Sequence, residues 1–179
     1  MTLDHIQIEL WQPDQSCVDA DVAMLGDVLY DCVNAGAAVS FILPFSRDDA
    51  AAFWRDHVLP NVRAGSARVL VARREEQIVG TVQLDLLTPP NQPHRAEVKK
   101  LLVRPDARGA GIARALMLAL EEQAREARRS LLTLDTASEI AEHVYLSIGY
   151  VRVGVIPRFS RRPDSPELEG TTVMYKELE

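Results

Sequence analysis

The chain has 179 residues, of which 47% are hydrophobic and 26% are charged, and its formal net charge is −6 at pH 7. This size predicts one domain over residues 1–179 that needs neither disulfides nor a structural metal, and the acidic balance argues against general nucleic-acid binding. The two cysteines are too few for a disulfide framework, the N-terminus lacks a signal-peptide pattern, and no apolar run approaches the ~20 residues of a membrane helix, so we expect a cytoplasmic protein that binds no membrane.

The first half of the chain predicts a strand, two helices and a β-hairpin. In chain order these are a strand over 6–11, a helix over 19–34, an apolar loop over 35–44, a helix over 46–63, and strands over 67–73 and 77–86. Ser46 is followed three residues later by Asp49, a pattern typical of a helix N-terminus. Pro60 predicts a kink or a shortening of that helix, because proline has no backbone N–H to donate.

The second half predicts four strands and two helices around one β-α-β unit. In chain order these are a strand over 95–103, a turn over 104–107, a helix over 111–128, a strand over 131–136, a helix over 138–148, a strand over 150–156, a loop rich in proline and arginine, and a strand over 171–176. The unit over 95–136 puts one parallel pair into a largely antiparallel sheet. The predicted fold class is therefore mixed α/β (α+β).

A glycine-bearing turn leads into the helix over 111–128, in the sequence Arg108-Gly109-Ala110-Gly111-Ile112-Ala113. Backbone N–H groups at a helix start are unpaired and carry partial positive charge, and small residues let a pyrophosphate approach them. A dinucleotide site has a similar order of strand, turn and helix. However, Arg114 occupies the third glycine position of that motif, and five residues separate the strand from Gly109. These two features favour a pyrophosphate site of another kind, and a dinucleotide-binding enzyme remains an alternative.

The residues around this turn resemble the GNAT acetyltransferase superfamily. Arg108-x-x-Gly111-x-Ala113 fits the family signature, Val103-x-Pro105 stands before it as in the family, and Ala141-x-x-x-Tyr145-x-x-x-Gly149-Tyr150 is similar to a second signature. Four stretches also resemble tabtoxin-resistance-type acetyltransferases, namely 95–101, 107–109, 131–136 and 150–154. The resemblance implies an acetyl-CoA-dependent N-acetyltransferase. Its implied fold is a central sheet of about seven strands, flanked by helices and splayed between the fourth and fifth strands.

The resemblance also implies which residues hold acetyl-CoA, the cosubstrate. The strand before the turn would bond the pantetheine arm through its free backbone groups, the turn would hold the pyrophosphate, and Ser138 stands where many members have an asparagine that bonds the pantetheine arm. The implied coenzyme-binding residues are Leu101, Leu102, Val103, Arg108, Gly109, Ala110, Gly111, Ile112, Ala113, Arg114 and Ser138. No metal is expected, because the four histidines show no paired metal-ligand spacing.

The chemistry of acetyl transfer to an amine requires a general base, because a lysine-like amine has a pKa of about 10.4 and is protonated at neutral pH. Glu97 lies where part of the family carries its catalytic glutamate, and Asp135 ends the next strand. Either carboxylate, directly or through water, can serve as the base. The resemblance places Tyr145 near the thioester sulfur, where it would protonate the leaving thiolate.

The acceptor is expected to be a primary amine of a small molecule, either amino-acid-like or an antibiotic or toxin. The segment from Ile156 to Pro163 contains arginines where the family borders its acceptor pocket, and an arginine fork suits a carboxylate. The apolar loop from Gly36 to Ile42 is expected to wall that pocket. The candidate acceptor-binding residues are Ser40, Phe41, Arg158 and Phe159. A protein or peptide acceptor and a non-catalytic acyl-CoA-binding module remain alternatives, and the chain is expected to be a monomer or a homodimer.

Overall fold

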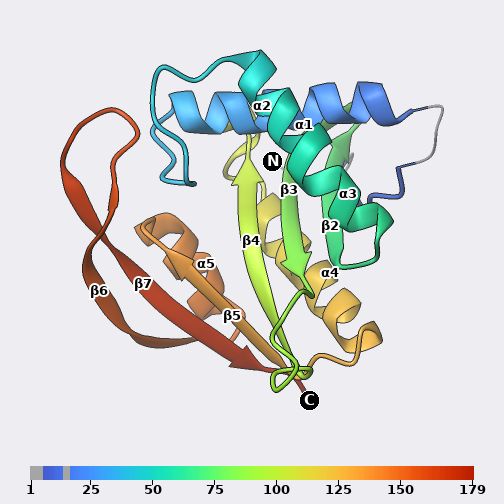
Figure 1. Ribbon diagram of the computed structural model, residues 1–179, viewed down its shortest axis with the longest axis vertical. Coiled ribbons are helices and arrows are strands. Elements are labelled where there is room, and N and C mark those ends of the chain that lie inside the picture. The colour runs from blue at the N-terminus through green and yellow to red at the C-terminus, as the bar shows by residue number, and fades with distance from the viewer. Residues whose placement is uncertain (1–5, 14–16) are drawn as a thin grey trace.

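A seven-stranded mixed sheet in the order β1-β2-β3-β4-β5-β7-β6 forms the centre of the computed structural model, which describes residues 6–13 and 17–179. The prediction that residues 1–5 carry no signal-peptide pattern lies outside this range. The seven strands and the flanking helices confirm the predicted fold class (Figure 1). Within the described residues, no helix is long and apolar enough to cross a membrane.

The strands follow the predicted positions closely. They are β1 (Ile6–Leu10), β2 (Ala67–Arg74), β3 (Gln77–Asp85), β4 (Arg95–Val103), β5 (Leu131–Thr136), β6 (Val151–Arg161) and β7 (Leu168–Glu177). Every pairing is antiparallel except that between β4 and β5, which is parallel because the helix between them returns the chain to the same end of the sheet. The last strand, β7, lies between β5 and β6, so β6 is an edge strand.

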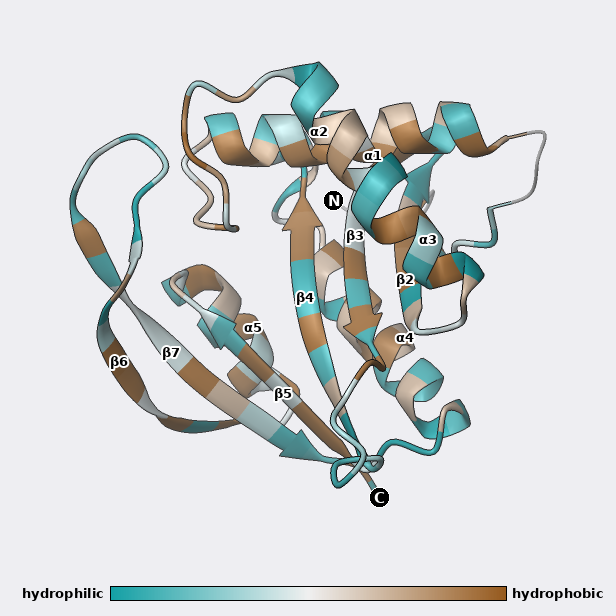
Figure 2. Ribbon diagram, in the orientation of Figure 1, coloured by the Kyte–Doolittle hydropathy of each residue, from teal (hydrophilic) through white to brown (hydrophobic). Residues whose placement is uncertain are grey.

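The helices cover both faces of the sheet. They are α1 (Val18–Asn34), α2 (Arg47–Phe53), α3 (Leu59–Arg63), α4 (Ile112–Glu126) and α5 (Glu139–Ser147). Buried residues of α1, including Leu25 and Leu29, belong to one apolar core, whereas Leu116 and Leu120 of α4 belong to a second one. Apolar and polar residues alternate along β4 (Figure 2), as expected for a strand whose two faces have different surroundings.

The predicted helix over 46–63 is divided into three parts. Its N-terminus is as predicted, since the Ser46 hydroxyl accepts from the Asp49 backbone N–H and the Asp49 carboxylate accepts from the Ser46 N–H. A π-helical turn over Trp54–Val58 then separates α2 from α3. The wider turn lies just before Pro60, which has no N–H and whose ring would clash with an ordinary preceding turn. The expected disturbance thus lies upstream of the proline.

The prediction of a loop after Ile156 is wrong for most of the predicted segment. Strand β6 continues to Arg161 and pairs with β7, which begins three residues earlier than predicted. Pro157 is compatible with this strand because an edge strand has N–H positions that no neighbour requires. The pairing shifts register between Ile156 and Ser160, and Arg158 lies in this bulge with a φ of 54°.

A buried ion pair joins β7 to α4. The Lys176 ammonium donates to both carboxylate oxygens of Glu121 at 2.7 Å and to the Ile148 carbonyl oxygen at 2.6 Å. Only 3% of the Glu121 side chain is exposed, and Arg125 approaches the same carboxylate at 3.9 Å. This contact fixes the C-terminal strand against the helix that begins at the predicted pyrophosphate loop.

Candidate active site

Strands β4 and β5 pair over only three residues and then separate. The paired residues are Arg95 with Leu131, Ala96 with Leu132 and Glu97 with Thr133. Beyond Glu97, β4 pairs with β3 alone, and Figure 1 shows β4 and β5 diverging towards α1 and α2. The edge of β4 over residues 98–103 therefore faces the gap, and it contains the predicted pantetheine-binding residues Leu101, Leu102 and Val103. The splay between the fourth and fifth strands is confirmed.

The predicted pyrophosphate loop lies beside this gap. A 3-10 turn (Pro105–Ala107) leads through Arg108 into α4, and Gly109 and Gly111 have φ values of 81° and 77°, which glycine adopts without strain. Gly111 is the N-cap of α4, and no side chain caps the helix. A Cβ at either glycine would meet nothing within 4 Å. An uncapped helix start over open space is an arrangement that binds anions.

The other residues of the loop differ in how they can contribute. The Arg108 side chain donates through Nε to the Val103 carbonyl oxygen at 3.1 Å, which ties the loop to the end of β4. Ile112 is buried in the core, so only its backbone can face a ligand, whereas Arg114 is exposed. Ala110 and Ala113 are half-buried. Ser138 caps α5, its hydroxyl accepting from the Ala141 N–H at 3.2 Å.

The two predicted carboxylates lie on the same face of the sheet. Glu97 and Thr133 are paired, and Asp135 lies two residues beyond Thr133, so their side chains share a face. Glu97 is ion-paired with Lys99 at 3.4 Å, and Lys99 also donates to Asp85 at 2.7 Å. Burial opposes the charge of Lys99, but these carboxylates outweigh it and raise the pKa of its ammonium.

Asp135 has a different set of neighbours. It accepts a hydrogen bond from the Thr171 hydroxyl of β7 at 2.8 Å and is otherwise exposed. Burial raises the pKa of the Tyr145 hydroxyl, and the negative charge of Asp135 raises it further. Asp135 and Tyr145 are therefore close enough to interact, and Tyr145 remains a protonated hydroxyl at neutral pH. The Tyr145 ring lies 5.6 Å from that of Tyr150.

Lys100 lies beside these residues, although it was not among the site residues predicted from the sequence. The pairing of β3 and β4 shifts register between Thr81 and Gln83, and Lys100 lies opposite this shift with a φ of 52°. Its ammonium donates to the Val39 carbonyl oxygen at 2.9 Å and to the Ser40 hydroxyl at 3.2 Å. Polar and apolar residues alternate over 95–99 of β4 and the alternation ends at the second lysine, which is the signal in the sequence.

The predicted acceptor residues fall into two groups. Ser40 contacts Lys100, and the Phe41 ring packs against those of Phe45 and Phe53 at 4.6 and 5.2 Å between centroids. Arg158 and Phe159, by contrast, lie in the bulge of β6 and are exposed. Among the described residues, no hydrogen bond or ion pair joins either one to β4, β5 or the loop over 35–45. The loop over 35–45 and the segment that follows β6 are joined at another point, where the Leu43 N–H donates to the Pro163 carbonyl oxygen at 2.8 Å.

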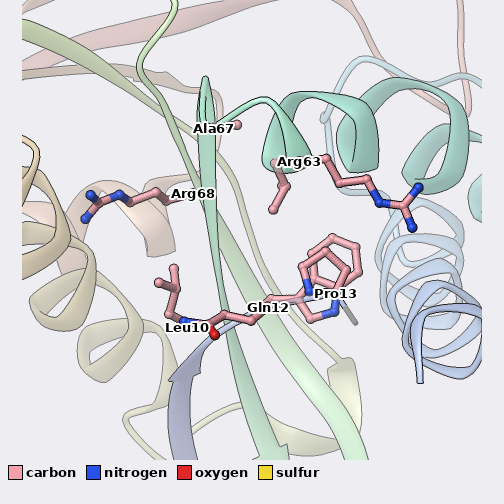
Figure 3. A pocket seen from close by; sticks show the side chains of 9 residues that line it. Leu10, Gln12, Pro13, Arg63, Ala67 and Arg68 are labelled. Carbon is pink, nitrogen blue, oxygen red and sulfur yellow. The ribbon is translucent and has the colours of Figure 1, made fainter. Parts of the chain in front are cut away.

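A separate pocket of about 570 Å³ opens near the edge of the sheet that is formed by β1 and β2, shown in Figure 3. It is lined by the end of β1, the start of β2 and the end of α3, including Leu10, Trp11, Arg63, Ala67 and Arg68. It contains none of the predicted site residues. The predicted site residues lie instead around the gap between β4 and β5 and in the segments on either side of it.

Comparisons with known proteins agree with this geometry. The model of the Acetyltransferase (GNAT) family matches residues 36–150. An N-acetyltransferase encoded in the hisH-hisA intergenic region of Azospirillum brasilense is 32% identical over 117 residues, which cover 64% of this chain and 67% of the relative. A protein named IAA acetyltransferase from the same organism is 35% identical over 100 residues, which cover 56% of this chain and 61% of the relative.

Solved structures have the same fold. An acetyltransferase of Salmonella typhimurium, solved with its cofactor acetyl-CoA, superposes with a TM-score of 0.78 at 17% identity, covering 98% of this chain and 95% of the other. A ribosomal-protein-alanine N-acetyltransferase of Brucella melitensis also superposes with a TM-score of 0.78, at 25% identity, covering 96% of this chain and 99% of the other.

Proposed function

The chain belongs to the Acetyltransferase (GNAT) family, and on that premise we propose that it transfers an acetyl group from acetyl-CoA to a primary amine of a small molecule by direct attack. The observation that carries this proposal is the gap between β4 and β5 beside the uncapped start of α4. The gap offers backbone groups to an extended ligand, and the helix start offers N–H groups to its pyrophosphate. The open space above Gly109 and Gly111 fits that group.

The residues around the gap divide the chemistry between them. Asp135 or Glu97 accepts a proton from the acceptor ammonium, directly or through water, and so provides the neutral amine. The amine nitrogen then forms its bond to the acetyl carbon, the carbon–sulfur bond breaks, and the nitrogen loses its second proton to water as the neutral amide forms. Tyr145 donates a proton to the departing thiolate. That demand is modest, because a thiol of pKa near 8.5 leaves readily even as the anion.

Replacing Gly111 with valine is expected to raise the KM for acetyl-CoA strongly. A β-branched residue at a φ of 77° is strained, and its side chain would occupy the space proposed for the pyrophosphate. Gly65→Val is the matched control, because Gly65 has a φ of 72° with equally open surroundings but lies between α3 and β2. Steady-state kinetics of both variants separate strain from binding. An unchanged KM in folded Gly111→Val protein contradicts the assignment.

Tyr145→Phe is expected to lower kcat more than it weakens the binding of acetyl-CoA, because the hydroxyl acts on the leaving thiolate. Tyr150→Phe is the matched control. Its ring is equally buried and lies beside that of Tyr145, and within the described part of the chain its hydroxyl has no hydrogen-bond partner. The measurement is kcat for both variants at saturating acetyl-CoA. If Tyr145→Phe stays within about twofold of the parent, Tyr145 is structural.

The acceptor class is the finer part of the proposal. The relative named IAA acetyltransferase supports a small-molecule acceptor, and the resemblance to tabtoxin-resistance-type enzymes favours an amino-acid-like compound. The similarity to a ribosomal-protein-alanine N-acetyltransferase favours the competing class, a protein N-terminus. Release of free thiol from acetyl-CoA, measured with a panel of amino acids, amine antibiotics and peptides, tests both. Acetylation of peptides alone contradicts a small-molecule acceptor.

A further inference from the structure

One lysine in the candidate site has no anionic partner among the residues that the structure describes. The sequence contains three lysines, Lys99, Lys100 and Lys176. Lys99 and Lys176 each contact a carboxylate at 2.7 Å. Lys100 forms no ion pair with any residue that the structure describes, although it is half-buried where β4 contacts the loop over 35–45. Charged groups that lose solvent are ordinarily paired, so this one requires an explanation.

The groups that contact the Lys100 ammonium carry no charge. Two of its three N–H groups donate to the Val39 carbonyl oxygen and the Ser40 hydroxyl, and the rings of Phe41 and Phe53 lie 5.5 and 5.7 Å away. Burial lowers the pKa of this ammonium and the charge of Lys99 lowers it further, while Asp135 acts in the opposite direction. One N–H donor therefore has no acceptor among the described residues, and the charge of Asp135 acts on this ammonium.

Two strained backbone positions lie at the same place. Of the five described residues with positive φ that are not glycine, Glu75 and Arg128 lie at a hairpin turn and just after a helix, and Arg158 lies in the exposed bulge of β6. Ser40 and Lys100 have φ values of 78° and 52°, and their side chains contact each other at 3.2 Å. Such strain persists where the surrounding structure enforces it, and it is often found at binding sites. Here the bulge in β4 is what brings the ammonium to the loop.

A neighbouring amide is also without a partner. Gln83 of β3 is paired with Lys99 of β4, so the two side chains lie on the face that holds Glu97 and Asp85. Only 7% of Gln83 is exposed, and its Nε2 has no hydrogen-bond partner among the described residues. An unpaired buried N–H group costs free energy that a bound acceptor group recovers. Two donors on one face of β3 and β4 thus lack acceptors.

We propose that Lys100 determines specificity by binding a carboxylate of the acceptor, with the apolar part of the acceptor against Phe41 and Phe53. This inference rests on the proposed function and identifies the substrate class. Asp135, on the same face, meets the ammonium end of such a molecule, so the site matches a zwitterion at both ends. The carboxylate is therefore bound by a lysine of β4 and not by Arg158, which lies exposed on β6.

The first test compares acids with their amides. Thiol release is measured with the standard amino acids and their carboxamides, using the parent, Lys100→Met and Lys99→Met. Lys100→Met is expected to lower kcat/KM for the acids about 10- to 100-fold, the effect of one charge-assisted hydrogen bond, mainly through KM, and to leave the amides within about threefold. Lys99→Met is expected to change acids and amides by the same factor, because its charge is paired with carboxylates.

Two controls distinguish recognition from support of the loop. Lys100→Gln retains a donor for Val39 and Ser40 without the charge, and it is expected to lose the preference for acids just as Lys100→Met does. Lys100→Arg is expected to restore part of that preference. If acids and amides fall equally in Lys100→Met, or if Lys100→Gln retains the preference for acids, Lys100 only holds the loop and the proposal is overturned.

A second test does not depend on turnover. Phenylacetate, a carboxylate with an aromatic group, is expected to raise the Tm of the parent and of Lys99→Met but not of Lys100→Met or Lys100→Gln, while phenylacetamide raises none of them. Equal stabilisation of the parent and Lys100→Met, or none of the parent, overturns the proposal. If phenylacetate behaves as expected but no amine is acetylated, the proposed function fails and the Lys100 site stands. If amines are acetylated equally well with and without a carboxylate, the proposed function stands and the Lys100 site fails.

Discussion

Asp135→Asn is expected to lower kcat by about 10²- to 10⁴-fold at neutral pH, the range that one positioned general base contributes. The carboxylate lies beside the gap, and its charge acts on Tyr145 and Lys100. Glu97→Gln is expected to have the smaller effect, because Glu97 is already ion-paired with Lys99. The loss is expected to shrink as the pH rises towards the amine pKa of about 10.4, because more of the acceptor is then neutral without a base.

The chain offers a matched control for this substitution. Glu142 accepts a hydrogen bond from the Thr172 hydroxyl at 3.0 Å, much as Asp135 accepts one from Thr171, but it belongs to α5 and is also paired with Arg152. Glu142→Gln is expected to keep the parental rate. Parental rates at neutral pH in both Asp135→Asn and Glu97→Gln contradict a carboxylate base.

Lys176→Met is expected to lower the free energy of unfolding by about 3–5 kcal/mol, because it leaves the buried Glu121 carboxylate without its closest partner. Urea unfolding measures this loss as a lower midpoint with an unchanged slope. The double variant Glu121→Leu with Lys176→Met is expected to recover most of it, since a well-packed apolar pair has no buried charge to compensate.

An exposed ion pair provides the comparison. The Arg55 Nε and the Asp56 Oδ1 form an ion pair at 3.1 Å, but more than half of each side chain is exposed. Arg55→Ala is expected to change the free energy of unfolding by less than about 1 kcal/mol, because water screens such pairs. If Lys176→Met lowers the free energy of unfolding as little as Arg55→Ala does, the ion pair between β7 and α4 does not stabilise the fold as its burial indicates.

The order and kind of the elements followed from local patterns. Alternation located β1, the Ser46 and Asp49 pattern located the start of α2, and the glycines at 109 and 111 located the start of α4. These features depend on interactions between residues close in sequence, and tertiary contacts do not change such interactions. The splay between β4 and β5 came from the family resemblance, because no local pattern records where two strands part.

Lys100 and Arg158 show what local patterns do not contain. Both lie in bulges, where one strand shifts against its neighbour and redirects its side chains. The shift in β4 depends on β3, about 20 residues away, and it brings Lys100 to Val39 and Ser40, which are about 60 residues away. In β6, proline and arginine indicated a loop, but pairing with β7 extended the strand. Tertiary contacts decided both outcomes.

The position of β7 has a consequence for how the protein folds. The last strand lies between β5 and β6, so β6 has no neighbour in the sheet until residues 168–177 are in place. The first five strands and α4 contain pairings that need no residue of β6 or β7. Folding during synthesis would therefore assemble the coenzyme side early. Thr171, which bonds Asp135, arrives with the last strand, so the acceptor side is completed only when β7 inserts.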